Sequence, residues 1–397
     1  MGLNEQVSGE RLHIGFFGLR NAGKSSVVNA VTGQRLSLVS DVKGTTTDPV
    51  RKAMELLPLG PVVIVDTPGL DDEGVLGEKR VARAKETLRT ADAAVLVVDA
   101  TRGLQPIDEA LLGEIRAKGI PCVIAMNKAD LLEALPPAPP QALYVSAKTG
   151  AGIFELKEAI AAAVQGNAQK ERGLLDGLVT AGQTVVLVTP IDSAAPKGRL
   201  ILPQQQTLRA LLDLGAAALV TRETELARTL ALLKAPPDLV ITDSQAFRMV
   251  AAIVPEATPL TSFSILFARY KSGDFARLLR GAAALDALRD GDTVLISEGC
   301  THHRQCGDIG TEKLPAWVRA YTGKQLQFAF TAGGEFPAEL SPYALVIHCG
   351  GCMLTPRVMQ TRLDTAAENG VPMTNYGVAI AKMNGILDRA TAMLPEK

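Results

Sequence analysis

One segment near the N-terminus limits the folds that this chain can adopt. Residues 18–25 read Gly-Leu-Arg-Asn-Ala-Gly-Lys-Ser and fit the phosphate-loop pattern G-x4-G-K-[ST], between an expected strand at 12–17 and an expected helix at 24–31. Glycines let backbone N–H groups surround phosphate groups, while Lys24 would neutralise phosphate charge and Ser25 would offer its hydroxyl to Mg²⁺. The pattern predicts a strand–loop–helix unit that binds a nucleoside triphosphate.

Four further motifs follow in the order that GTP-binding domains require. Asp66 ends an expected strand, where its carboxylate can reach Mg²⁺ while the N–H of Gly69 senses the γ-phosphate. Asp130, in the run Asn127-Lys128-Ala129-Asp130, can accept from guanine N1 and N2 together, a pairing that adenine does not offer. The other two motifs are a loop able to close over Mg²⁺, Gly44 to Asp48, and a run whose backbone N–H can meet guanine O6, Ser146-Ala147-Lys148.

These motifs define the candidate residues for GTP and its Mg²⁺ ion, and the first part of the chain resembles the Ras-like G domains of the Era/TrmE type. The nucleotide-binding candidates are Gly18, Asn21, Ala22, Gly23, Lys24, Ser25, Ser26, Thr45, Thr46, Asp66, Gly69, Asn127, Lys128, Asp130, Ser146, Ala147 and Lys148. The Mg²⁺ ligands among them would be Ser25, Thr46 and Asp66, and the residues assigned to hydrolysis are Asn21, Lys24, Thr46 and Gly69. We predict a GTP hydrolase that cycles between GTP and GDP.

Two residues refine the expected hydrolysis. Leu70 stands where Ras-like proteins place the glutamine that orients the attacking water, so unaided hydrolysis should be slow. Asn21 matches the asparagine of potassium-activated G domains, in which a monovalent cation replaces an arginine finger. We therefore expect K⁺ to stimulate turnover through Asn21. The alternative is a loop asparagine that only satisfies backbone groups.

Short apolar runs alternate with helical stretches along the chain, which favours parallel sheets covered by helices. We predict an α/β chain of three domains: a Ras-like P-loop G domain at 1–170 and two smaller α/β domains at 171–265 and 266–397. The expected strands are 12–17, 62–65, 93–98, 123–126, 142–145, 185–189, 217–220, 239–242, 259–262, 293–297 and 345–347. The expected helices are 24–31, 81–89, 107–118, 154–164, 207–214, 224–233, 245–253 and 355–369.

The third domain concentrates the soft metal ligands of the chain. All of its cysteines and histidines lie in two short runs, Cys300-Thr301-His302-His303 with Cys306, and His348-Cys349-Gly350-Gly351-Cys352. Each run follows an expected strand, so Cys300 can meet the C-x-x-C turn at one sheet edge. Three thiolates with a further ligand fit a structural zinc of Cys3His type or an iron–sulfur cluster. His303 and Cys306 could instead be surface or buried side chains.

The whole arrangement is similar to the FeFe-hydrogenase maturation GTPases of the HydF family, in the order G domain, ligand-free α/β domain, CTHHRQCGDIG and HCGGC. The resemblance implies a 4Fe–4S cluster on Cys300, Cys349 and Cys352, with His302 and His348 as possible fourth ligands or as residues beside the cluster. It also implies that 171–265 is a dimerisation domain and 266–397 the cluster-binding domain. The family's role is that of a scaffold and carrier, which receives a di-iron subcluster precursor and delivers it for H-cluster assembly.

The same resemblance implies the partners: a second copy of the chain, radical-SAM hydrogenase maturases and apo FeFe-hydrogenase. The net charge of −1 gives no reason to expect nucleic acid as a partner. No uninterrupted apolar run reaches 18 residues and the N-terminus has no signal-peptide pattern, so we expect no membrane partner and a cytoplasmic location.

Two other functions use the same motifs. An RNA- or ribosome-assembly GTPase with a zinc-stabilised C-terminal domain would need a distinctly basic appendage, whereas residues 266–397 are nearly balanced in charge. A G-protein-coupled enzyme with a catalytic zinc would need a general base beside the cysteines. Glu298 could serve as that base, but no other residues of the sequence gather around it. The scaffold GTPase is the function that we predict.

Overall fold

The computed structural model describes residues 11–33, 50–57, 59–69, 75–167, 173–191, 200–300 and 308–394. The chain divides into two compact units, Met1–Glu171 and Arg172–Lys397. Among the described residues, no helix combines the length and apolar character that a bilayer crossing needs.

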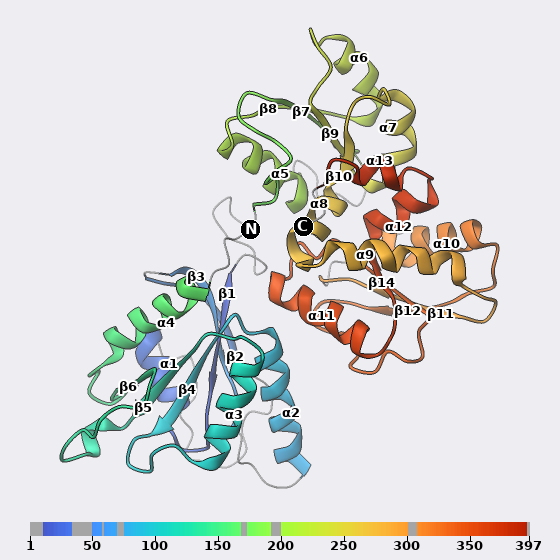
Figure 1. Ribbon diagram of the computed structural model, residues 1–397. Helices are drawn as coiled ribbons and strands as arrows, with labels where there is room; N and C mark the ends of the chain where they lie inside the picture. The colour runs from blue at the N-terminus through green and yellow to red at the C-terminus, as the bar shows by residue number, and fades with distance from the viewer. Residues whose placement is uncertain are drawn as a thin grey trace. The chain divides into compact units, whose positions relative to one another are not determined.

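The N-terminal unit is built on one six-stranded sheet in the order β2-β3-β1-β4-β5-β6, in which every neighbouring pair except β2–β3 is parallel (Figure 1). Its strands are β1 (Leu12–Phe17), β2 (Val50–Leu56), β3 (Gly60–Asp66), β4 (Ala93–Asp99), β5 (Cys122–Asn127) and β6 (Ala142–Tyr144). Its helices are α1 (Lys24–Thr32), α2 (Val75–Thr90), α3 (Pro106–Ala117) and α4 (Ile153–Asn167).

Helices cover both faces of this sheet because its central strands are apolar on both sides. On one face, Val27 of α1 and Leu156 of α4 join a core with Ile14 and Val95. On the other, Leu88 of α2 and Ile115 of α3 pack with the opposite side chains of the sheet. Because helices cover both faces of the sheet, the ends of its strands are left uncovered.

Strand β2 was not predicted, and its pairing differs from the parallel arrangement that we expected. It pairs antiparallel with β3 and lies at the sheet edge, with Arg51, Lys52 and Glu55 exposed. Its apolar residues, Met54 and Leu56, alternate with polar ones over too short a run to distinguish the segment from a loop. Charged side chains on an edge strand also protect it from pairing with other chains.

The C-terminal unit contains two four-stranded parallel sheets, in the orders β10-β9-β7-β8 and β12-β11-β13-β14 (Figure 1). The strands are β7 (Thr184–Val188), β8 (Ala217–Thr221), β9 (Leu239–Thr242), β10 (Leu260–Ser262), β11 (Thr293–Ser297), β12 (Gln327–Thr331), β13 (Leu345–His348) and β14 (Met373–Asn375). The helices are α5 (Leu202–Asp213), α6 (Leu226–Ala231), α7 (Phe247–Ile253), α8 (Phe263–Ser272), α9 (Phe275–Ala282), α10 (Leu314–Thr322), α11 (Pro356–Glu368), α12 (Tyr376–Met383) and α13 (Leu387–Thr391).

Helix α8 joins the two sheets into one core. It begins directly after β10, where the Ser262 hydroxyl accepts a hydrogen bond from the N–H of Ile265 and caps the helix. Phe263 and Leu266 are buried in one hydrophobic cluster with Val186 of the first sheet and Ile347 of the second. The two sheets are therefore held together by shared apolar packing.

Polar contacts add to this packing at two points. The Nζ of Lys313 donates to Gln245 Oε1 at 2.8 Å, across the two halves of the unit. The guanidinium of Arg389, on α13, donates to backbone carbonyls that follow or end α7, namely those of Ala251 (3.3 Å), Val254 (3.0 Å), Pro255 (2.7 Å) and Thr258 (3.4 Å). These carbonyls include ones that the end of α7 leaves without helical partners.

Replacing Arg389 tests this second contact. Arg389→Met keeps the apolar stem but removes the charged donors, so we expect the free energy of unfolding to fall by about 2 kcal/mol. The one tryptophan of the chain, Trp317, lies in this unit, so its fluorescence in urea reports the transition. As a control, Arg209→Met breaks an exposed ion pair with Asp213 and should leave the midpoint almost unchanged. Equal midpoints for both variants would contradict the role of Arg389.

Candidate functional site

The phosphate loop lies between β1 and α1 and needs glycine at two positions. Gly18 has φ 141° and Gly23 has φ 88°, both in a region that L side chains rarely adopt. A Cβ on Gly18 would lie 2.1 Å from the carbonyl oxygen of Val97, and one on Gly23 would lie 2.3 Å from Nδ2 of Asn127. The loop is thus closely packed against β4 and β5, with no space for side chains at these two residues.

The candidate phosphate and Mg²⁺ residues lie together at this loop. The buried Lys24 donates its Nζ to the carbonyls of Gly18 at 3.0 Å and Leu19 at 2.8 Å, so its charge is held inside the loop. The Ser25 hydroxyl donates to Oδ2 of Asp66 at 2.7 Å. Mg²⁺ prefers oxygen ligands. The hydroxyl and the carboxylate are in contact at the end of β3, so together they can bind the same ion.

The guanine-side motifs are linked to the phosphate loop through Asn127. Its Nδ2 donates to the carbonyl of Ala22 at 3.0 Å, and its Oδ1 accepts from the N–H of Ala147 at 3.1 Å. The exposed Asp130 accepts from the Ser146 hydroxyl at 2.7 Å, which fixes one carboxylate oxygen. The structure therefore brings three of the predicted motifs together at the ends of β1, β5 and β6.

Asp99 is a residue of this site that the sequence analysis missed. It ends β4, and its Oδ2 forms an ion pair with Nζ of Lys128 at 2.5 Å. Burial raises the pKa of Asp99, but hydrogen bonds from Lys128 and Thr101 outweigh it and hold the pKa below its usual value. The feature of the sequence that could have identified Asp99 is its position at the end of an apolar strand, the same position that Asp66 occupies.

The structure also locates several other residues that we predicted to bind the nucleotide. Asn21 is exposed at φ 61°, a left-handed conformation that asparagine tolerates, and Lys148 is exposed as well. Gly69 lies close to the backbone of Arg20 in the phosphate loop. Thr45, Thr46 and Leu70 lie outside the described residues.

The candidate metal ligands of the third domain follow β11 and β13, which pair in parallel with Ser297 opposite His348. The sulfur of Cys349 accepts from the N–H of Gly299 at 3.0 Å and from the N–H of Gly351 at 3.4 Å. Burial, followed by the nearby charges of Cys349 and Cys300, raises the pKa of the Cys352 thiol to about 12. The structure therefore brings Cys300, Cys349 and Cys352 to one edge of the sheet.

His348 is the last residue of β13 and directly precedes Cys349. It is fully buried, with Nδ1 at 2.8 Å from the carbonyl oxygen of Cys349 and Nε2 at 2.7 Å from NH1 of Arg362. Burial and the nearby Arg362 charge lower the pKa of His348 to about 3, so the imidazole is neutral. Both ring nitrogens are engaged in hydrogen bonds within the protein.

Glu298 is also buried beside the cysteines. The Tyr376 hydroxyl donates to its Oε1 at 3.3 Å, and burial followed by the Glu298 charge raises the pKa of Tyr376. His302, His303 and Cys306 lie outside the described residues. Within the described part of the chain, no three His, Cys, Asp or Glu side chains are grouped as ligands of a single metal ion.

The comparisons with known proteins agree with the nucleotide site. A family model for the 50S ribosome-binding GTPase matches residues 13–128. The tRNA modification GTPase MnmE of Nitrosospira multiformis is 35% identical over 158 residues, which cover 38% of this chain and 34% of that protein. GTPase Der of Kosmotoga olearia is 34% identical over 128 residues, which cover 31% of this chain and 29% of that protein. The chain thus spans about a third of the length of these curated relatives.

Solved structures give weaker matches. A variant of Aquifex aeolicus Era bound to GDP.AlF4⁻ is 20% identical, with 53% of this chain and 92% of that chain covered and a TM-score of 0.35. The G domain of the T. maritima FeoB iron transporter is 25% identical, with 39% of this chain and 100% of that chain covered and a TM-score of 0.30.

The phosphate loop, its guanine-side motifs and the family match define the N-terminal unit as a P-loop GTPase domain. The C-terminal unit matches two further family models, the hydrogen maturase F dimerization domain at residues 174–272 and its tetramerization domain at 276–393. The chain therefore belongs to the hydrogen maturase F family, with a GTPase domain fused to these two domains. The predicted family, α/β fold class and GTPase class are confirmed.

The close packing of Gly23 leads to a prediction. Gly23→Ala places a Cβ against Asn127 at a left-handed φ, so we expect it to lower the free energy of unfolding by about 3 kcal/mol. Gly33→Ala is a matched control, because Gly33 also has a left-handed φ but an added Cβ would meet nothing within 4 Å, and it should cost about 1 kcal/mol. Calorimetry of the full chain measures both variants. Equal losses would show that the contact with Asn127 has no effect.

Proposed function

We propose that this hydrogenase maturation GTPase binds a 4Fe–4S cluster on Cys300, Cys349 and Cys352 and acts as a scaffold and carrier. In this proposal it receives the di-iron subcluster precursor from radical-SAM maturases and delivers it to apo FeFe-hydrogenase. The observation that carries the proposal is that Cys300 follows β11 while Cys349 and Cys352 follow β13, two parallel strands that end side by side. The two hydrogen maturase F domains support the same assignment.

The surroundings of Cys349 suit a cluster thiolate. Its sulfur accepts two backbone N–H bonds, from Gly299 and Gly351, and such bonds stabilise negative charge on sulfur and tune a cluster's potential. Sulfurs that hold a cluster need not converge on one ion, because the iron–sulfur core lies between them. The bound cluster would supply an iron with an exchangeable fourth position, at which a precursor can attach.

The contacts of His348 bear on the fourth ligand of the proposed cluster. His348 uses both ring nitrogens in hydrogen bonds with Cys349 and Arg362, which favours a place beside the cluster over ligation. His302 remains a candidate ligand outside the described residues, and so does Cys306. Three cysteine ligands leave one iron accessible, whereas a fourth thiolate would close the site.

Self-association is supported by the dimerization and tetramerization domains, and we propose a homodimer formed through β8. This strand is an edge of its sheet, and its side chains are exposed or half-buried, with Val220 45% exposed. A parallel edge with free backbone groups can pair with a second copy.

Cysteine replacement tests the cluster. Anaerobic reconstitution should give a brown protein with about four iron atoms per chain and a reduced S = 1/2 EPR signal, and the triple variant Cys300→Ser, Cys349→Ser, Cys352→Ser should lose both. Cys122→Ser is the control, because Cys122 lies in β5 of the GTPase domain and should leave iron content unchanged. Undiminished iron in the triple variant would refute the site, and a colourless protein with bound zinc would favour the Cys3His alternative.

We also propose that hydrolysis is slow and that K⁺ stimulates it through Asn21, which lies exposed in the phosphate loop. A fixed cation beside the phosphates would stabilise the charge of the transition state. Asn21→Ala should therefore lower the rate in K⁺ by at least about tenfold, to the rate in Na⁺. Phosphate release in the two salts measures this effect, with the neighbouring Arg20→Ala as control. Equal rates of the unaltered protein in K⁺ and Na⁺ would exclude the mechanism.

A further inference from the structure

We propose that Arg362 is a positioning residue of the three-cysteine site. It fixes the strand ends that carry Cys300 and Cys349 and holds His348 in the tautomer that keeps its imidazole away from the metal. The proposal deepens the proposed function and rests on its assignment of the three cysteines. The tautomer of His348 is a property of the metal-free protein, so it can be measured without a bound cluster.

Arg362 is a buried cation whose two terminal nitrogens contact three acceptors. It lies on α11 and is only 3% exposed. NH1 lies 2.7 Å from Nε2 of His348 and 3.4 Å from Oγ of Ser297, and NH2 lies 2.6 Å from the carbonyl oxygen of Gly333. The guanidinium also lies over the ring of Phe336, 5.1 Å from its centroid. A charge removed from water requires such partners, so this geometry is strongly constrained.

These acceptors belong to the ends of three adjacent strands. Ser297 ends β11, His348 ends β13, and Gly333 follows β12. Cys300 comes shortly after Ser297, and Cys349 directly after His348. The N–H of Cys349 also donates to the carbonyl of Ser297 at 2.9 Å. One planar guanidinium thus ties together the two strand ends from which the cysteines project.

The same side chain determines the tautomer of His348. Arginine carries only donors, so Nε2 of His348 must accept and cannot carry the proton. The proton of the neutral ring is then on Nδ1, which donates to the carbonyl of Cys349 at 2.8 Å. Ligation through Nε2 would leave the buried guanidinium without this acceptor, at a substantial free-energy cost. Arg362 therefore disfavours His348 as a metal ligand.

A fixed positive charge beneath the cysteines has an electrostatic consequence. Thiolates and a bound iron–sulfur unit together carry negative charge, which increases when the unit is reduced. A buried cation nearby stabilises the reduced form more than the oxidised form, because charges interact strongly away from water. Removing the charge of Arg362 should therefore shift the midpoint potential to more negative values.

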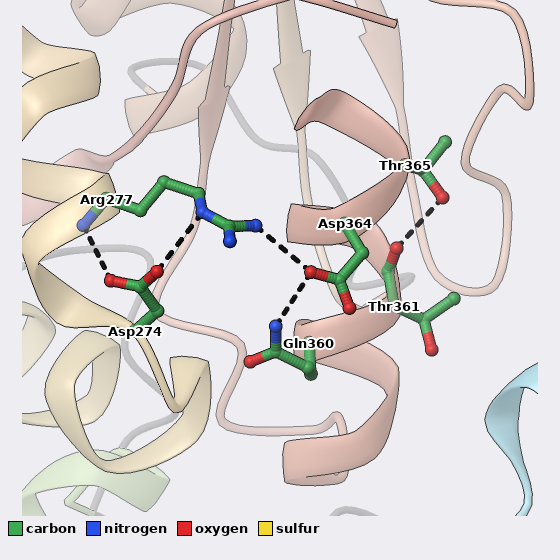
Figure 2. A network of polar contacts seen from close by, with 6 residues as sticks. All are labelled: Asp274, Arg277, Gln360, Thr361, Asp364 and Thr365. Atoms are coloured by element: carbon green, nitrogen blue, oxygen red, sulfur yellow. Dashed lines mark hydrogen bonds and ion pairs between the residues drawn. The ribbon is translucent and has the colours of Figure 1, made fainter. Parts of the chain in front are cut away.

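The variants separate charge from geometry. Arg362→Met removes the charge and the donors but keeps an unbranched stem, while Arg362→Lys keeps the charge and loses the planar fork. Arg277→Met is the matched control. Arg277 binds the outer side of the same helix, with NH1 at 3.0 Å from Asp364 Oδ1 in the network of Figure 2, and it is 34% exposed.

The first measurement uses the full-length protein without metal. In spectra of ¹⁵N-histidine-labelled protein, the signal of His348 is identified by its loss in His348→Asn. In the unaltered protein this signal should show an imidazole that is protonated at Nδ1 and unprotonated at Nε2. Arg277→Met should leave the signal unchanged. In Arg362→Met this signature should be lost or mixed. An Nε2–H ring in the unaltered protein, or an unchanged ring in Arg362→Met, would overturn the proposal.

The second measurement uses the reconstituted protein. We expect a more negative midpoint potential in Arg362→Met, a smaller shift in Arg362→Lys and no shift in Arg277→Met. An Arg362→Met potential equal to that of the unaltered protein would refute the electrostatic role. Iron that survives loss of all three cysteines would refute the proposed function instead, and the histidine spectra of the metal-free protein would still decide whether Arg362 sets the tautomer.

Discussion

Parallel strand pairing is the constraint on which both sites of this protein depend. Because neighbouring parallel strands end at the same edge of a sheet, residues far apart in sequence meet without any long loop to carry them. The pairing of Ser297 with His348 brings the sulfur of Cys349 against the N–H of Gly299, the residue before Cys300, and the Cys349 N–H bond to Ser297 secures the register. Strand β13 is buried on both faces, with Leu345 and Ile347 in one core and Val346 in another, so a slip by one residue would exchange side chains between two differently packed cores.

The GTPase domain uses the same device for different chemistry. Phe16 pairs with Asp66 and Asp99 pairs with Asn127, which brings the Asp66 carboxylate and the guanine-side motif to the edge where the phosphate loop lies. Short side-chain bonds then join the loops to each other, as Asn127 does between Ala22 and Ala147. In both units, packing brings the loops close and hydrogen bonds set their final positions.

The sequence predicted the elements whose apolar character is strong and whose ends carry recognisable chemistry. The strands at 12–17, 239–242 and 293–297 have the predicted bounds because each is an apolar run bounded by polar or turn residues. The edge strands β2, β12 and β14 were missed. Strands β2 and β12 mix polar and apolar residues as loops do, and the buried β14 is only three residues long. Arg362 was missed for another reason. A single arginine in an amphipathic helix gives no sign of burial, which only the packed structure reveals.

The position of α8 has a consequence for how the C-terminal unit works. The family boundary falls just after this helix, yet its residues Phe263 and Leu266 belong to the core that both sheets share. Its Ser264 and Phe267 also lie against Gly350, in the turn between the two cysteines of the C-x-x-C motif. Because protein cores are close-packed, a displacement of α8 would be felt at that turn. The edge strand β8 and the three cysteines are thus parts of one continuously packed body, and an event that alters the first sheet has a physical route to these cysteines.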